Sequence, residues 1–417
     1  MSDAPHHASL MPLDEALQRL LEHAAPLERT EEVDTFDADG RVLARDVVSA
    51  LQVPPHDNSS MDGYAVRTSN IIAPGVELAV SQRIQAGHAG DALAPGSTAR
   101  IFTGAPLPAG ADAVVMQEDA DVLDGGARVR INVKPRPWQW VRAAGEDVKI
   151  GTVVLEKGER LTPAAIGLAA GIGLARLPVV ARPRVALFST GDELVMPGAI
   201  APEQLPRGAI YNSNRFFLAA LLRRMGCEVQ DFGTVPDRPN ATVLALRSAA
   251  REHDLIITSG GVSVGGEDHI KPAIEQLGTL DLWQIAMKPG KPFVYGHIGK
   301  DEAARVHFMG LPGNPVSSFV TFLLLVRPFL LKLQGATRLD VPAMHLRADF
   351  ELPRADKRRE FLRARRNARG GLDLFSNQSS GVLTSAHWAD GLIDHPAGST
   401  IAQGDMVRFI PLSELLA

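Results

Sequence analysis

Glycines, hydroxyl groups and charged side chains gather between residues 258 and 293 in a pattern suited to phosphate. The apolar run Leu255-Ile256-Ile257 predicts a buried strand, and it leads directly into a glycine-rich turn. Such a turn directs successive backbone N–H groups at one point, which is how a loop holds phosphate oxygens. The candidate ligand-binding residues of this turn are Ser259, Gly260, Gly261, Ser263 and Gly265.

Charged residues follow the turn within the same predicted α/β unit. Asp268 supplies a hard oxygen suited to Mg²⁺, and Lys288 and Lys291 supply fixed positive charge. The stretch lacks the Gly-Lys-Ser/Thr ending of a P-loop and the GxGxxG spacing of a dinucleotide fold. For the glycines alone, a tightly packed strand-to-helix turn is the alternative. Together these residues predict a pocket for a phosphorylated ligand and for a second, small oxyanion.

The composition is that of an ordinary globular protein. The chain has 417 residues, 45% of them hydrophobic and 22% charged, which predicts two to four domains. A net charge of −5 argues against nucleic-acid or anionic-membrane binding, so an anion site must be a local basic patch. The single cysteine, Cys227, excludes an intrachain disulfide and a cysteine metal cluster. No secretory signal or membrane span is recognisable, so we expect a cytoplasmic protein.

Changes in sequence texture predict a multidomain α/β and β protein with four parts. Residues 10–53 and 141–181 are predicted to form an elongated, discontinuous first domain around an inserted β-rich domain, residues 54–140. Strands and helices alternate over residues 182–334, which predicts a mainly parallel, three-layer α/β domain. Short strands and turns over residues 335–417 predict a small β-barrel-like C-terminal domain.

Three further motifs add to the glycine loop. They are Pro54-Pro55-His56-Asp57-Asn58-Ser59-Ser60-Met61-Asp62-Gly63-Tyr64-Ala65, Ile101-Phe102-Thr103-Gly104-Ala105-Pro106-Leu107-Pro108 and Gly310-Leu311-Pro312-Gly313-Asn314-Pro315-Val316-Ser317. With them the chain closely resembles the molybdopterin molybdenumtransferase family, also called MoeA, which includes the E domain of gephyrin. The resemblance covers nearly the whole chain in the family's order.

The resemblance implies a specific activity. Members insert molybdenum, supplied as molybdate, into adenylylated molybdopterin with release of AMP, the last common step of molybdenum cofactor biosynthesis. It also implies a Mg²⁺-dependent homodimer whose site combines the α/β domain of one subunit with the insertion of the other. The expected protein partners are the molybdopterin-adenylylating protein and molybdoenzyme apoproteins or their chaperones.

Site residues are carried over by position. The resemblance implicates Asp62 and Thr103 in the site across the dimer, and Glu193, Asp237 and Asp268 at strand ends of the α/β domain. Three converging carboxylates repel one another without a cation, which makes these three acids the candidate Mg²⁺ ligands. For Asp62 and Asp237, an acid that only stabilises a turn is the alternative, and for Thr103 it is a turn cap.

The same resemblance assigns oxyanion binding to a second set of residues. That set is Lys288, Lys291, Pro292, Ser317 or its neighbour Ser318, Arg358 and Ser380. Lys357 replaces the glycine that commonly precedes this arginine, a departure at the position next to Arg358. Arginine suits molybdate as it suits phosphate, because its planar donors bind two oxygens together.

No nucleophile is indicated, because no serine lies in a GxSxG elbow and the histidines are scattered. The sequence therefore favours a positional and electrostatic mechanism, in which either water or a molybdate oxygen attacks the pyrophosphate. Two other functions stay open. One is a molybdopterin adenylyltransferase or nucleotide phosphohydrolase, which would need only the central α/β domain. The other is a gephyrin-like, non-catalytic scaffold, although every candidate ligand is retained and the additional fused trimerising domain is not expected here.

Overall fold

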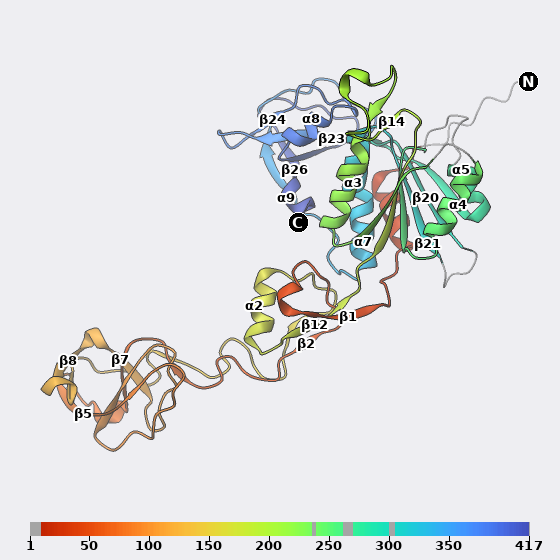
Figure 1. Ribbon diagram of the computed structural model, residues 1–417. Coiled ribbons are helices and arrows are strands. Elements are labelled where there is room, and N and C mark those ends of the chain that lie inside the picture. The colour runs from red at the N-terminus through yellow and green to blue at the C-terminus, as the bar shows by residue number, and fades with distance from the viewer. Residues whose placement is uncertain (1–9, 236–238, 262–269, 300–304, 417) are drawn as a thin grey trace, which may run out of the picture.

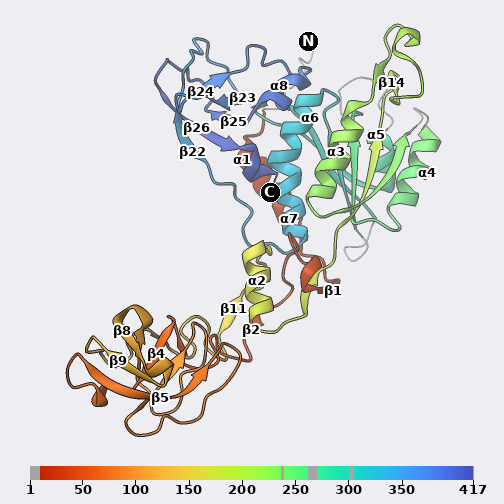
Figure 2. The same ribbon diagram turned by 60° about the vertical axis from the view of Figure 1, so that its left-hand side comes forward.

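The chain is elongated, with a β-rich region at one end and two larger lobes at the other (Figures 1 and 2). The computed structural model describes residues 10–235, 239–261, 270–299 and 305–416. A narrow stalk joins the two ends through short antiparallel strand pairs, β1 (Thr30–Asp34) with β12 (Arg176–Val180) and β2 (Val47–Val48) with β11 (Val153–Leu155). Helix α2 (Pro163–Gly171) belongs to this stalk.

One lobe is built on a six-stranded sheet with the order β16-β13-β17-β21-β20-β18. Its strands are β13 (Arg184–Ser189), β16 (Glu228–Thr234), β17 (Leu255–Ser259), β18 (Gly278–Gln284), β20 (Pro292–Ile298) and β21 (Val306–Leu311). The first four strands in this order are parallel, which confirms the predicted α/β fold. Strands β20 and β18 extend the sheet in antiparallel fashion.

Helices cover both faces of this sheet. They are α1 (Leu13–Glu22), α3 (Ser213–Arg224), α4 (Pro239–Ala249) and α5 (Ile270–Leu277), together with a long helix that begins at Pro315. Leu187 and Ile257 pack into a core with α1, α3 and the long helix, whereas the neighbouring Ala186 and Ile256 pack with α4 and α5. Because successive strand residues point to opposite faces, both faces require apolar side chains.

The long helix has three parts, α6 (Pro315–Thr321), a π-helical segment (Phe322–Val326) and α7 (Arg327–Leu333). Among the described residues it is the one helix whose length and composition would allow it to cross a membrane. However, 83% of its apolar window is buried inside the protein. It is therefore a core helix, and it lies between the sheet of the α/β lobe and the C-terminal lobe (Figure 2).

The second lobe contains a sheet with the order β19-β23-β25-β26-β22, and β24 pairs with β23. Its elements are β19 (Met287–Lys288), β22 (Met344–Arg347), β23 (Arg359–Arg366), β24 (Leu372–Leu374), α8 (Leu383–Trp388), β25 (Gly391–His395), β26 (Met406–Pro411) and α9 (Leu412–Leu415). Strand β19 comes from the range predicted for the α/β domain, yet it pairs in parallel with β23. The two lobes are thus joined by a strand pair, and the four domain ranges remain a proposal.

The inserted region forms a sheet with the order β7-β4-β6-β5-β9-β8. Its strands are β4 (Gly63–Val66), β5 (Val76–Ile84), β6 (Ser97–Ile101), β7 (Ala113–Met116), β8 (Ala120–Leu123) and β9 (Arg128–Ile131). All four residues of β4 are buried between β6 and β7. At Gly63 a Cβ atom would lie 1.9 Å from the carbonyl oxygen of Val115, so only glycine fits there.

We expect Gly63→Ala to lower the unfolding temperature, because the added methyl group must displace backbone in a buried strand at a cost of about 2 kcal/mol. Gly167→Ala is the matched control, since nothing lies within 4 Å of the added Cβ and the site is inside helix α2. That control should be neutral or stabilise by up to about 1 kcal/mol. Calorimetric scans of the two variants check both expectations, and equal unfolding temperatures would contradict the packing argument.

Candidate functional site

Two strand ends meet at the carboxyl edge of the α/β sheet. The backbone N–H of Thr190 donates to the carbonyl oxygen of Ser259 at 3.2 Å, and the Thr190 hydroxyl donates to the same oxygen at 3.3 Å. Gly260 donates in turn to the carbonyl of Leu311 at 3.0 Å. Gly260 has a φ of +92°, and a Cβ atom there would lie 2.8 Å from the carbonyl oxygen of Thr190. The first part of the predicted glycine turn therefore requires glycine for close backbone approach.

Asn214 connects this turn to the start of the long helix. Its buried Nδ2 donates to Ser259 Oγ and to the carbonyl oxygen of Gly313, both at 2.8 Å. Sequence reasoning missed this residue. The available signal was the Asn212-Ser213-Asn214 run at a helix start, where the side chain of Asn212 caps α3 by accepting from Arg215 N.

Buried polar atoms at this edge lack protein hydrogen-bond partners in the described part of the chain. They include Ser189 Oγ, Asn212 Nδ2, Asn214 Oδ1 and Thr258 Oγ1. Ser318 Oγ and Thr321 Oγ1, on helix α6, share this property. Since buried polar groups are normally paired, these atoms are candidates for hydrogen bonds to water or to a polar ligand.

Glu193 lies exposed beyond this edge, and its side chain folds back over Gly191. A Cβ atom at Gly191 would lie 2.5 Å from Glu193 Oε2. The other predicted acids, Asp237 and Asp268, and the loop residues Ser263 and Gly265 lie outside the described residues. Among the residues the structure describes, no three His, Cys, Asp or Glu side chains are arranged to hold a metal ion.

The predicted oxyanion residues Lys288 and Arg358 lie close together where the two lobes join. Lys288 Nζ is 2.8 Å from Glu360 Oε1 and 3.1 Å from Asp356 Oδ2. Arg358 binds the same aspartate, with Nε 3.2 Å from Oδ1 and Nη2 3.4 Å from Oδ2. Asp356 therefore bridges the two cations. Neither carboxylate was a sequence prediction, and only the pairing of β19 with β23 brings them to the lysine.

Electrostatics favour the charged forms of Lys288 and Asp356. The hydrogen bond to Glu360 is the main reason that the pKa of Lys288 is raised, and burial opposes it. Burial alone would raise the pKa of Asp356, but hydrogen bonds from Arg358 and Lys288 outweigh it and lower that pKa to about 2. At neutral pH Lys288 is thus protonated and Asp356 is ionised.

Two of the remaining predicted oxyanion residues, Ser317 and Ser380, lie at helix α6. Ser317 on α6 is buried, and the carbonyl of Ser380 accepts from the backbone N–H of Val316 at 2.9 Å. A Cβ atom at Gly290 would lie 2.6 Å from Thr321 Oγ1, so the turn after Lys288 packs directly on α6. Lys291 is exposed at the end of that turn, and Pro292 begins β20. The structure thus brings the Lys288 turn and Ser380 against one helix.

Asp62 and Thr103 lie together in the inserted region, far from this cluster in the same chain (Figure 1). Asp62 Oδ1 accepts from the backbone N–H of Thr103 at 2.8 Å and from its hydroxyl at 2.9 Å. These two bonds, the backbone one first, lower the pKa of the exposed Asp62 carboxyl, and nearby Arg100 adds to the effect. The pair therefore holds a fixed negative charge on the surface.

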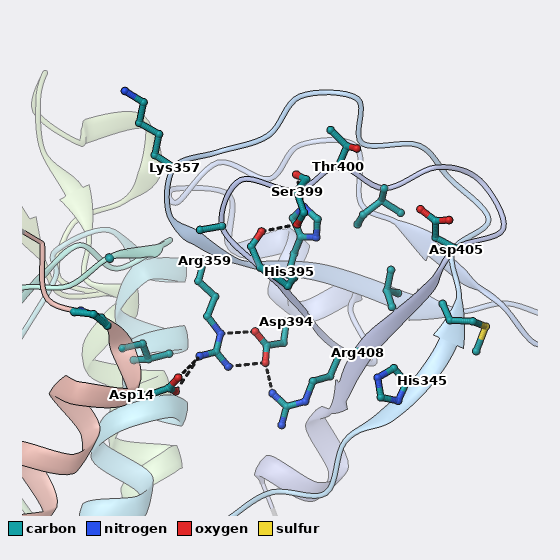
Figure 3. A pocket seen from close by; sticks show the side chains of 18 residues that line it. Asp14, His345, Lys357, Arg359, Asp394, His395, Ser399, Thr400, Asp405 and Arg408 are labelled. Atoms are coloured by element: carbon teal, nitrogen blue, oxygen red, sulfur yellow. Dashed lines mark hydrogen bonds and ion pairs between the residues drawn. The ribbon is translucent and has the colours of Figure 1, made fainter.

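A cavity of about 880 Å³ lies apart from these residues, between helix α1 and the C-terminal sheet (Figure 3). Its wall includes Arg359, which pairs with Asp394 and Asp14, and Arg408, which also pairs with Asp394. Arg359 precedes Glu360 on β23, and neighbouring strand residues point to opposite faces. This cavity is therefore on the other side of β23 from the Lys288 cluster, and the volume alone does not mark the site.

Family models match almost the entire chain. They are the MoeA N-terminal region (domain I and II) at residues 11–173, a probable molybdopterin binding domain at 186–332 and the MoeA C-terminal region (domain IV) at 345–412. This chain belongs to the MoeA family. Similar curated proteins include a molybdopterin molybdenumtransferase of Haemophilus influenzae, 42% identical with 78% of each chain covered. Another, from Nostoc, is 38% identical, with 93% of this chain and 84% of that protein covered.

Solved structures of the family are similar as well. A crystal structure of the molybdopterin biosynthesis moeA protein from Pyrococcus horikoshii OT3 has a TM-score of 0.83 and 28% identity, and it covers 97% of this chain and 100% of that chain. Gephyrin of Dictyostelium discoideum is 33% identical over 78% of this chain, but only half of that protein is covered.

We expect Thr103→Val to raise the pKa of Asp62 while leaving it below the ordinary value of about 3.9, because the backbone N–H still donates. Since the folded pKa is depressed, the stabilisation by these bonds is present above the ordinary pKa and is lost as pH falls. A carboxyl-detected NMR titration of wild type and variant measures the shift. An unchanged Asp62 pKa would show that the hydroxyl bond contributes nothing to the charge.

Proposed function

We propose that this member of the MoeA family is a molybdopterin molybdenumtransferase that inserts molybdenum from molybdate into adenylylated molybdopterin and releases AMP. The observation that carries the proposal is that Lys288 and Arg358 both bind Asp356 and so form one cationic cluster. Asn214 in turn connects the residue before helix α6, Gly313, to Ser259 at the glycine turn. A fixed pair of cations suits a small oxyanion, and the polar sheet edge suits the phosphates of the larger substrate.

The larger substrate is assigned to the carboxyl edge of the α/β sheet. Gly260 and Gly261, both with positive φ, begin the turn that would hold its phosphates, and Ser263 and Gly265 would continue it. The unpaired buried atoms of Ser189 and Thr258 support a polar ligand at this edge. Open parallel sheets bind their ligands outside the same edge.

Molybdate is assigned to the cation cluster. Lys288, Lys291 and Arg358 would neutralise its charge, and Ser317 and Ser380 would supply neutral contacts beside helix α6. Their role is to hold the oxyanion against the dithiolene sulfurs of the bound substrate. Molybdate and adenylylated molybdopterin then react within one complex and need not meet in solution. The residues need to form no covalent bond to either substrate.

We assign Mg²⁺ to the three acids that the family pattern indicates, whose oxygen chemistry suits this ion. Glu193, Asp237 and Asp268 all offer hard carboxylate oxygens, and the Glu193 side chain is exposed where a ligand would lie. Bound there, Mg²⁺ would neutralise the pyrophosphate that is cut. Of the three acids, Glu193 lies within the described residues, and its carboxylate is exposed beyond the carboxyl edge of the sheet.

A second copy of the chain is expected to complete the site. Asp62 and Thr103 are held on an arm that lies far from the cation cluster of its own chain (Figure 2). In a twofold homodimer the arm of each copy would reach the lobes of the other, which produces two equivalent composite sites. The molybdopterin-adenylylating protein, which supplies the substrate, and the molybdoenzyme apoproteins or their chaperones, which receive the product, would then bind the same dimer.

The activity is tested by AMP release from adenylylated molybdopterin with and without molybdate, in the presence of Mg²⁺. We expect release that depends on molybdate, and a loss of about 100-fold for Lys288→Ala because a charge-assisted contact to the oxyanion is removed. Arg338→Ala is the control, because it removes an exposed cation that has no proposed role in the site. Incorporation of AMP from ATP instead would support adenylylation and contradict the transferase proposal.

The composite site predicts complementation between two inactive variants. Asp62→Ala and Lys288→Ala dimers should each be inactive, but mixed dimers contain one site with both residues intact. After subunit exchange at equal amounts, activity should recover to roughly a quarter of wild type, since half of the dimers are mixed and each has one good site. Recovery that does not exceed either parent would show that Asp62 and Lys288 do not act across a subunit boundary.

A further inference from the structure

The two carboxylates that bind Lys288 are held in different ways. Glu360 lies on β23 and its side chain is 6% exposed, so the strand fixes its position. Asp356 lies before β23, outside any helix or strand, and its side chain is 22% exposed. Glu360 therefore holds the lysine from a buried strand, whereas Asp356 holds it from a more exposed position outside the sheet.

Asp356 contacts both cations in the manner expected of an oxyanion ligand. Its Oδ2 accepts from Lys288 Nζ at 3.1 Å, and its Oδ1 accepts from the backbone N–H of Arg358 at 3.0 Å. The Arg358 guanidinium reaches both carboxylate oxygens, at 3.2 and 3.4 Å. The carboxylate thus uses the charged donors that were assigned to molybdate.

We propose that Asp356 is an internal competing anion, which occupies the Lys288–Arg358 position until a tetrahedral divalent oxyanion displaces it. The inference deepens the proposed function, because it takes the displacing anion to be the molybdate that the transferase uses. Lys288 remains bound to Glu360 during the exchange, so one cation keeps its orientation while the other side of the site opens.

This arrangement has two physical consequences. Cations that face each other without an anion repel, and Asp356 removes that repulsion in the free protein. An incoming anion displaces Asp356 favourably only if its negative charge exceeds the single charge of this carboxylate. The exchange therefore favours divalent molybdate over monovalent anions such as chloride. Asp356 is thereby a specificity-determining residue that weakens the binding of every anion and weakens that of monovalent anions most.

The test compares molybdate binding by intact wild type and Asp356→Asn protein in equilibrium dialysis, followed by the KM for molybdate in the AMP-release assay. We expect Asp356→Asn to bind molybdate on the order of tenfold more tightly and to show a lower molybdate KM, since one competing charge is gone. Chloride should inhibit molybdate binding more strongly in the variant. Glu351→Gln removes an exposed carboxylate five residues earlier and should bind as wild type does.

The Glu360→Gln variant distinguishes a carboxylate that positions Lys288 from one that competes with molybdate. Loss of the fixed carboxylate should weaken molybdate binding, the opposite of the effect at Asp356. Weaker or unchanged binding by Asp356→Asn, or no molybdate binding by either protein, overturns the inference, provided that calorimetry shows wild-type unfolding. Tighter binding without any molybdate-dependent AMP release would uphold the anion exchange and overturn the transferase proposal, so the two failures are distinguishable.

Discussion

Burial of the helix Pro315–Leu333 is the constraint on which the arrangement of the lobes depends. A helix this apolar must be covered on nearly all sides, and here the sheet of one lobe, helix α1 and the C-terminal lobe cover it. Its first turn consequently lies where both lobes end. Val316 contacts Ser380 from the C-terminal lobe, and Gly313, just before the helix, contacts Asn214 from the other. Core packing thus brings parts of both lobes to the same end of this helix.

The charges beside this helix obey a second constraint. Glu360 is 5% exposed as a residue, and a buried carboxylate is tolerated only when it is paired. Its pairing with Lys288 therefore stabilises the folded arrangement of the two joined strands. In the proposed anion site, Glu360 would keep Lys288 engaged, and the binding of an incoming anion would depend on how firmly the second carboxylate, Asp356, is held.

Much of the α/β lobe could be predicted because local pattern and burial agree there. The continuous apolar run of β17 indicated a strand covered on both faces, and helices do cover both. Contacts between distant segments could not be predicted. Asp356 lies 68 residues from Lys288, and only the pairing of β19 with β23 shows that they meet. Asn214 was missed because its bonds to Ser259 and Gly313 join residues 45 and 99 positions away.

The position of the inserted region relative to the lobes could not be predicted from the sequence either. Its sheet contains its own buried clusters, which are separate from the cores of the two lobes. Asp62 receives two hydrogen bonds that hold its charge on the surface, an arrangement that contributes little to a core. The narrow stalk places that charge far from the cations of the same chain (Figure 1). A fixed carboxylate at the end of a long arm is useful when it faces another surface, and in the proposed homodimer the cation-bearing lobes of a second copy would provide one with complementary charge.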